Sequence, residues 1–172
     1  MPAVLVVVLL VFLVPAVFHY VTMGVMGENR ADSGVNSFLN GTEWTGTDGS
    51  LIEFHEDGSY IWYKDEFDTS DYYYEGTFRF MMGQAAFDYI TQDLSDYGVT
   101  EDELDAFIAR GNSYTFDSLV CLVLHNTSQI VEGEEQVINA YDTPCFGFYF
   151  ENEEYLDIAN MNTGTYWGFT KK

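Results

Sequence analysis

Basic residues are scarce in this 172-residue sequence, where six Lys and Arg face 28 Asp and Glu. The formal net charge is −22 at pH 7. A surface this acidic repels the phosphates of nucleic acids and anionic lipid headgroups, so we expect no nucleic-acid binding. Because no charged residue precedes Glu28, the whole charge belongs to the part of the chain that follows an uncharged beginning.

Cysteine is nearly absent, with Cys121 and Cys145 as its two examples. They lack the paired spacing of zinc ligands, and we predict neither a metal site nor a cofactor. In an exported domain, two cysteines usually form one structural disulfide, so we predict a Cys121–Cys145 bond. The alternative, which a cytoplasmic location would favour, is two reduced and buried thiols.

Catalytic motifs are missing as well. The sequence contains no G-x-S-x-G nucleophile motif and no glycine-rich phosphate loop with a lysine, and His55 and His125 each stand alone near a strand end. We therefore predict no catalytic residues and a non-enzymatic protein. Glycoside hydrolysis requires two carboxylates in a cleft, so Glu53, Glu75 and Asp157 are kept as candidates for a hydrolase.

An apolar N-terminal segment is the most conspicuous feature that is present. No residue from Pro2 to Phe18 is polar. A helix over residues 3–26 is long enough to cross a hydrocarbon core of about 30 Å. We expect residues 1–26 to be a retained membrane anchor rather than a cleaved signal peptide, because the apolar stretch is long and no basic residue precedes Arg30. We expect the following domain outside the cytoplasm, and the missing basic start is consistent with a chain that begins further upstream.

The remaining sequence divides into a polar linker over residues 27–37 and one β domain over residues 38–172. Hydrophobic residues make up 47% and aromatic residues 17% of the chain, which favours a packed core over disorder. The segment "SLIEFHEDGSYIWYK" predicts a hairpin with its turn at Asp57-Gly58, and "YYYEGTFRF" alternates with Tyr72, Tyr74, Phe78 and Phe80 on one face. The segment "SLVCLVLHN" is apolar on both faces, so we expect it to be central or covered by helices.

A two-helix insertion is predicted at about residues 82–110. In its second helix, Thr100 and Glu103 form a capping box, Val99 and Leu104 suit a hydrophobic staple, and Gly111 is a C-terminal stop. Strands resume after the insertion and end in a hairpin about residues 162–164. The predicted fold class is therefore mainly β, an antiparallel meander or small β-barrel with a helical insertion behind one N-terminal transmembrane helix.

The stretch "NGTEWTGTDGSLIEFHEDGSYIWY", followed by "YYYEGTFRF", resembles the opening of small bacterial lipocalin-like domains. Gly41 and Trp44 correspond to the first-strand signature with one additional residue between them, Gly58 to the following turn and Gly76 to a later strand. The resemblance implies a calycin-type barrel with or without a bound ligand, and no shared catalytic residues.

The aromatic residues of the predicted barrel have two interpretations. An eight-stranded barrel is just wide enough to be filled by its side chains or to hold one small ligand. Filling is the default expectation. If there is a cavity, its predicted lining is Phe54, Trp62, Tyr74, Phe78, Phe148 and Trp167.

An acidic loop offers a possible partner surface, which we predict from Asp65, Glu66, Asp68, Asp71 and the outward-facing Tyr73. Such a surface suits a basic protein, and the alternative is an inert solvated loop. Three function classes follow. The first is a membrane-tethered, extracytoplasmic, non-enzymatic binding or accessory module. The second is an acidic inhibitor or immunity-type protein that binds a basic partner, and the third is an extracytoplasmic hydrolase.

Overall fold

The computed structural model describes residues 38–110 and 114–172. The predicted anchor, the linker and the predicted helix stop at Gly111 lie outside these residues. Within the described residues, no helix has the length and apolar character needed to cross a bilayer.

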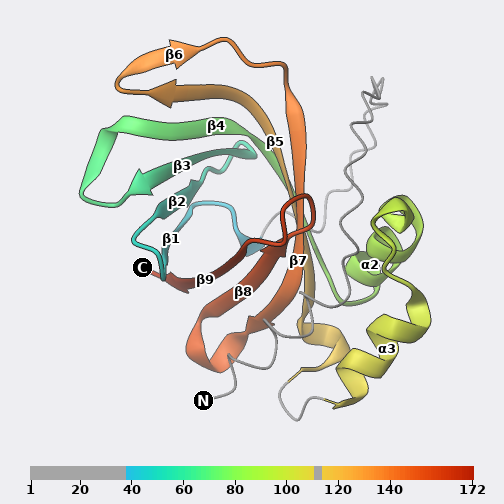
Figure 1. Cartoon of the computed structure of the whole chain (residues 1–172). Coiled ribbons are helices and arrows are strands. Elements are labelled where there is room, and N and C mark those ends of the chain that lie inside the picture. The colour runs from blue at the N-terminus through green and yellow to red at the C-terminus, as the bar shows by residue number, and fades with distance from the viewer. Residues whose placement is uncertain (1–37, 111–113) are drawn as a thin grey trace.

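The domain is an antiparallel β-barrel (Figure 1). Its strands are β1 (Thr42–Gly46), β2 (Leu51–Phe54), β3 (Ser59–Asp65), β4 (Asp68–Met82), β5 (Leu119–Val131), β7 (Tyr141–Phe150), β8 (Tyr155–Asn160) and β9 (Tyr166–Lys171). The barrel closes because β1 pairs with β9, and β4 pairs with β5 across the helical insertion. The short β6 (Glu134–Gln136) pairs with β5 alone, outside this ring. The mainly β prediction is confirmed, and the closed barrel is compatible with a lipocalin-like fold.

Alternation along each strand gives the barrel an apolar interior. On β4, residues 72, 74, 78 and 80 share the inner face, as the sequence predicts. The core that they join is formed by Trp44, Ile52, Phe54, Tyr60, Phe78, Phe80, Val120, Leu122, Leu124, Cys145, Leu156, Ile158 and Phe169. A bulge on β5 interrupts the register, since Glu75 pairs with Ser128 whereas Gly76 pairs with Asn126.

One end of the barrel is closed by the residues that precede β1. Phe38 stacks on Phe80 at 5.5 Å between ring centroids and meets Tyr149 edge-on at 4.6 Å. Trp44 lies 6.3 Å from Phe38 and is fully buried, and its indole N–H donates to the Thr42 hydroxyl at 2.8 Å. The tryptophan of the first-strand signature thus forms part of this closed end.

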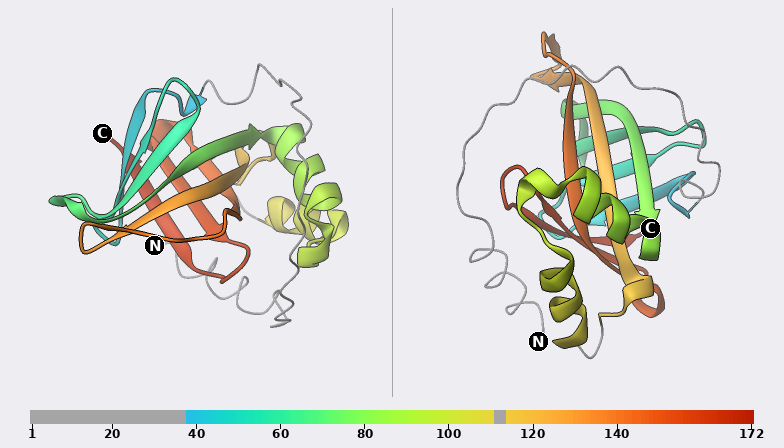
Figure 2. Two further views of the ribbon diagram at one scale, coloured as in Figure 1. Left: turned by 90° about the horizontal axis from the view of Figure 1, so that it is seen from above. Right: turned by 90° about the vertical axis from the view of Figure 1, so that its right-hand side faces the viewer.

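The helical insertion lies on one side of the barrel (Figures 1 and 2). It consists of α2 (Gly83–Asp88), a π-helical turn (Tyr89–Asp93), a 3-10 turn (Ser95–Tyr97) and α3 (Glu101–Arg110). The predicted capping box is present: the Thr100 hydroxyl accepts from the Glu103 amide at 3.3 Å, and the Glu103 carboxylate accepts from the Thr100 amide at 3.2 Å.

The insertion covers a second apolar core on the outer face of β5 and β7. Leu119, Cys121 and Val123 of β5 pack there with Phe148 of β7 and with Leu104 of α3. Their neighbours on β5 point into the barrel instead. The prediction that this strand is covered by helices is therefore confirmed.

The predicted disulfide is wrong, because the two cysteines lie on opposite faces of the sheet. Cys145 pairs across the strands with Leu122, the residue after Cys121. The Cys145 side chain therefore points into the barrel, whereas Cys121 points toward the helices. Both are free and buried thiols, and burial raises the pKa of Cys121 to about 12 and that of Cys145 higher still.

Candidate functional site

Four of the six rings that the sequence offered as a cavity lining pack in the core inside the barrel, namely Phe54, Trp62, Phe78 and Trp167. Phe54 and Phe78 are buried edge-to-face at 4.7 Å. Trp62 and Trp167 pack edge-to-face at 4.7 Å and are both half-buried. The assignment of Phe148 to this set is wrong, because its ring lies on the outer face beneath the helical insertion.

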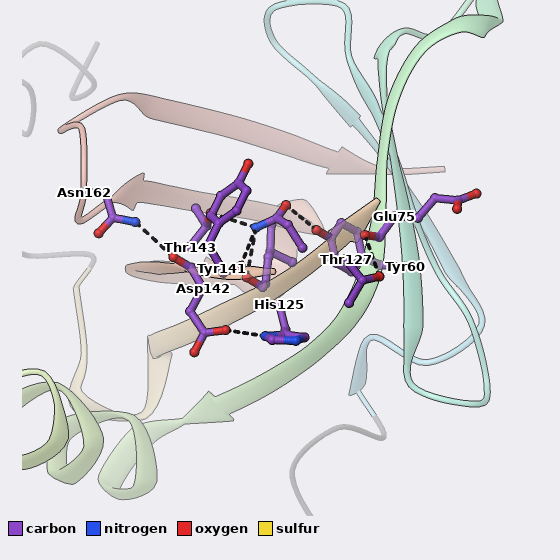
Figure 3. A network of polar contacts seen from close by, with 10 residues as sticks. Tyr60, Glu75, His125, Thr127, Tyr141, Asp142, Thr143 and Asn162 are labelled. Carbon is purple, nitrogen blue, oxygen red and sulfur yellow. Dashed lines mark hydrogen bonds and ion pairs between the residues drawn. The ribbon is translucent and has the colours of Figure 1, made fainter. Parts of the chain in front are cut away.

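A buried hydrogen-bond network around Asn126 of β5 joins this strand to β3 and β7, and its members Tyr60, Tyr141 and Thr143 are labelled in Figure 3. The Tyr60 hydroxyl donates to the Asn126 side-chain oxygen at 2.7 Å. The Asn126 amide donates to the Leu124 and Tyr141 carbonyls at 3.2 and 3.1 Å and to the Thr143 hydroxyl at 3.0 Å. Burial raises the pKa of Tyr60 far above its ordinary value. These groups satisfy one another, which identifies the network as structural.

A second polar cluster joins three half-buried side chains of β4 and β5. The hydroxyls of Tyr72 and Tyr74 are 3.0 Å apart, and the Gln129 amide donates to them at 2.9 and 3.2 Å. Burial, followed by the bond to Tyr72, raises the pKa of Tyr74. The sequence placed Tyr74 inside correctly, but nothing in the pattern identified Gln129 as its partner.

The residues of the predicted acidic surface lie on the β3–β4 hairpin, but they do not form one continuous surface. Asp65, Asp68 and Asp71 line an open hollow of about 500 Å³, together with Lys64, whose ammonium lies 5.0 Å from the centroid of the Tyr72 ring.

The other members of that predicted surface lie elsewhere. Glu66 turns toward Lys172, with 3.3 Å between carboxylate and ammonium. The ring centroids of Tyr73 and Tyr63 lie 5.6 Å apart. Phe67, which was not part of the predicted surface, is 90% exposed at the tip of the hairpin. Binding of a basic partner here stays a prediction.

The carboxylates kept as hydrolase candidates are not brought together. Glu53 lies on β2, Glu75 on β4 and Asp157 on β8, and no two of these strands are neighbours in the barrel. The Glu53 carboxylate lies 3.7 Å from the His55 ring. Of the three, only Asp157 is buried.

Asp157 lines a pocket between the barrel and the helical insertion, here called the outer pocket. It encloses about 70 Å³. Its floor is the outer face of β7 and β8, and its roof is the start of α3 with the turn before it. Its lining includes Leu104, Phe107, Phe148, Asp157, Ala159 and Met161.

The Asp157 carboxyl is placed in surroundings that do not satisfy it. The residue is 7% exposed, and its Oδ1 is buried without a hydrogen-bond partner in the described part of the chain. Burial raises the pKa of this carboxyl from 3.8 to about 7. Burial also raises the pKa values of Tyr114 and Tyr155, and the charge of Asp157 adds to both shifts. Perturbed carboxyls of this kind in a pocket are typical of functional sites.

Aromatic rings form the wall beside Asp157. Phe148 is the cross-strand partner of Asp157. Its ring centroid lies 5.5 Å from that of Phe107 on α3 and 4.7 Å from that of Tyr114, and the latter two lie 5.3 Å apart. Phe148 of β7 and Phe107 of α3 thus form the wall, and Tyr114, from the segment between α3 and β5, packs against both.

The rim of the outer pocket is held by a bond between the insertion and the β8–β9 turn. The Tyr97 hydroxyl donates to the Asn162 side-chain oxygen at 2.6 Å, and the Asn162 amide donates to the Asp142 carbonyl at 3.1 Å. The Asn160 side chain accepts from the Asn162 backbone at 2.8 Å, which fixes the turn itself. The pocket is therefore preformed.

The two histidines among the described residues make local surface contacts. His55 lies 2.9 Å from the Ser59 hydroxyl and His125 lies 2.6 Å from the Asp142 carboxylate. Among residues 38–110 and 114–172, no three His, Cys, Asp or Glu side chains are grouped to hold a metal ion.

Comparisons with protein-family models, with curated proteins and with solved structures give no match to this chain.

Proposed function

We propose that this protein is a membrane-tethered, extracytoplasmic binding module of the lipocalin-like type, and that its ligand site is the outer pocket rather than the barrel interior. The observation that carries the proposal is the buried Asp157 carboxyl, whose Oδ1 has no partner in the described part of an otherwise largely apolar site. Burying an unsatisfied polar group costs about 1–3 kcal/mol. A ligand that bonds to this carboxyl would offset that cost.

Binding fits the pocket better than hydrolysis does. A glycosidase requires two carboxyl groups that flank the scissile bond. Glu103 is the second carboxylate in the lining, but its Oε2 accepts from the Thr100 amide and hydroxyl at 3.2 and 2.8 Å in the capping box. Its geometry is thus explained by helix capping, and Asp157 is left as a single group suited to bind a ligand.

Filling the outer pocket is expected to abolish binding without unfolding the domain. In Ala159→Leu the added carbons take up the pocket volume. Ala86 is fully buried outside the pocket lining, so Ala86→Leu has no free space to fill and should lower the free energy of unfolding by about 1–3 kcal/mol through overpacking. The probe is 1-butanol, titrated against the full chain in lipid nanodiscs, with the Met161 and Ala159 methyl resonances as reporters.

Saturable shifts are expected in the wild type and in a pocket-neutral control, Ala85→Leu, on the exposed side of α2. The Met161 resonance should not shift in Ala159→Leu. Equal saturable binding by Ala159→Leu and the wild type would contradict the site, and an unperturbed wild-type spectrum would contradict binding there altogether.

The membrane location rests on the sequence, because residues 3–26 lie outside the described residues. The full chain is expected to stay in the membrane pellet after carbonate extraction, and its β domain should be digested by protease added to intact cells. Recovery in the soluble fraction, or a domain protected until the cells are lysed, would refute the tether or the orientation.

A further inference from the structure

We propose that the outer pocket selects a small organic cation, a short alkyl chain that ends in an ammonium group paired with Asp157. This rests on the proposed binding function and names the chemical class of its ligand. The inference follows from the charge of the lining, from the aromatic wall and from the size of the pocket.

The charge of the lining has one sign. Asp157 and Glu103 are its carboxylates, and its described residues include no Lys, Arg or His. Asp157 is 7% exposed, so water screens it poorly, and a cation at hydrogen-bond distance gains more than it would at the surface. An anionic ligand would be repelled by these carboxylates, and the described lining offers it no basic side chain as a partner.

The aromatic wall supplies a second attraction for the same charge. Phe107 and Phe148 line the pocket, and the Tyr114 ring packs against both of them. Because the faces of aromatic rings carry partial negative charge, an ammonium group within about 6 Å of a ring centroid is stabilised by about 0.5–2 kcal/mol. A neutral alcohol of the same shape lacks this contribution.

The size of the pocket limits the ligand to a few heavy atoms. Its volume of about 70 Å³ is roughly half that of the cavity of about 150 Å³ that accommodates benzene. A four-carbon chain with one polar end group is of the right order. Leu104, Ala159 and Met161 supply the apolar surface against which such a chain would pack.

Three four-carbon probes of similar size separate the contributions: n-butylammonium, 1-butanol and butyrate. Each is titrated at pH 8 against the full chain in nanodiscs of zwitterionic lipid, with the Met161 and Ala159 methyl resonances as reporters. At this pH Asp157, whose pKa is about 7, is mostly ionised. We expect butylammonium to bind at least tenfold more tightly than 1-butanol, and butyrate not to bind.

The matched variants are Asp157→Asn and Asp105→Asn. Both remove one carboxylate, but Asp105 is exposed on α3 and does not line the pocket. The preference for butylammonium over butanol should vanish in Asp157→Asn and persist in Asp105→Asn. Butanol should bind the wild type and Asp157→Asn alike, which shows that the variant keeps its pocket.

The outcomes distinguish this inference from the proposed function. Equal binding of butanol and butylammonium to the wild type, or a preference that survives in Asp157→Asn, overturns the cation assignment and leaves the binding site intact. Tighter binding of butyrate overturns it as well. If none of the three probes shifts the reporters, the outer pocket is not a binding site and both proposals are wrong.

Discussion

Replacing Asp157 with asparagine is expected to raise the free energy of unfolding by about 2 kcal/mol at pH 8 and by much less at pH 4. Asparagine has nearly the shape of the protonated acid and carries no charge to desolvate. Burial raises the pKa of Asp157 from 3.8 to about 7 in the folded protein, and a shift of this size corresponds to about 4 kcal/mol. The pocket is not fully enclosed, so solvent screening reduces the expected effect to about half of that figure.

The sign follows from proton linkage. Below pH 3.8 the carboxyl is protonated in both states, so folding buries no charge at Asp157. Between pH 3.8 and about 7 the unfolded chain ionises first, so wild-type stability falls as the pH rises. Above about pH 7 both states are ionised and the difference from the variant stays constant.

Urea unfolding of the full chain in nanodiscs, followed by tryptophan fluorescence at pH 4, 6 and 8, measures the difference between variant and wild type. Asp105→Asn is the control and is expected to change stability by less than about 0.5 kcal/mol at each pH. If Asp157→Asn is destabilising at pH 8, then the carboxylate is satisfied by a partner within the folded chain. That result would remove the main support for the outer pocket as a ligand site.

Such a gain in stability is what a binding role predicts. Functional sites often retain groups that destabilise the free protein, because the ligand and not the fold satisfies them. A purely structural aspartate would be expected to hold a cap, a turn or a salt bridge. Asp48 does this here, accepting from the Ser50 amide and hydroxyl at 3.1 and 2.7 Å.

Local sequence patterns predicted the faces of a strand correctly where one face is apolar and the other is polar. β4 carries alternating aromatic and polar residues, and its inner and outer faces are as predicted. The capping box at Thr100 and Glu103 is equally local, since its residues lie within one turn of helix. In both cases the deciding contacts are close in sequence.

Prediction failed on β7, which is apolar on both faces. The sequence assigned Phe148 to the interior, yet this ring packs under the helices together with Phe146 and Phe150. The inner face holds Cys145 and Gly147 instead. At Gly147 a Cβ would overlap the Asp157 carbonyl, so only glycine permits this close approach of β7 and β8. The same reversal separates the cysteines, because neighbouring register positions face opposite ways.

Asp157 was one of three strand carboxylates kept as hydrolase candidates, and composition alone could not rank them. A local signal did exist: Asp157 stands between Leu156 and Ile158 in a strand without another charged side chain. What the sequence lacked was the position of α3, whose Leu104 and Phe107 form the roof over this aspartate. The site arises from a contact between segments about 50 residues apart, which no local pattern encodes.

Replacing Trp44 with alanine is expected to lower the free energy of unfolding by about 3–5 kcal/mol. Trp44 is 0% exposed at the closed end of the barrel, where its ring lies 6.3 Å from the centroids of both Phe38 and Tyr149. Removing the indole leaves a cavity that this rigid barrel end cannot refill. A loss of this size is a large fraction of the total stability of a small domain.

Trp167→Ala is the matched control, because Trp167 is half-buried and packs on the ring of Trp62 at the centroid distance of 4.7 Å. Because Trp167 is partly exposed, its removal loses less buried apolar surface and leaves a smaller cavity. Trp167→Ala is therefore expected to lower the free energy of unfolding by about 1–2 kcal/mol. Urea unfolding followed by circular dichroism at pH 7 compares the two variants without relying on the fluorescence of the deleted residue. Equal losses would mean that the two tryptophans contribute alike, and the first-strand tryptophan would then have no special part in closing the barrel.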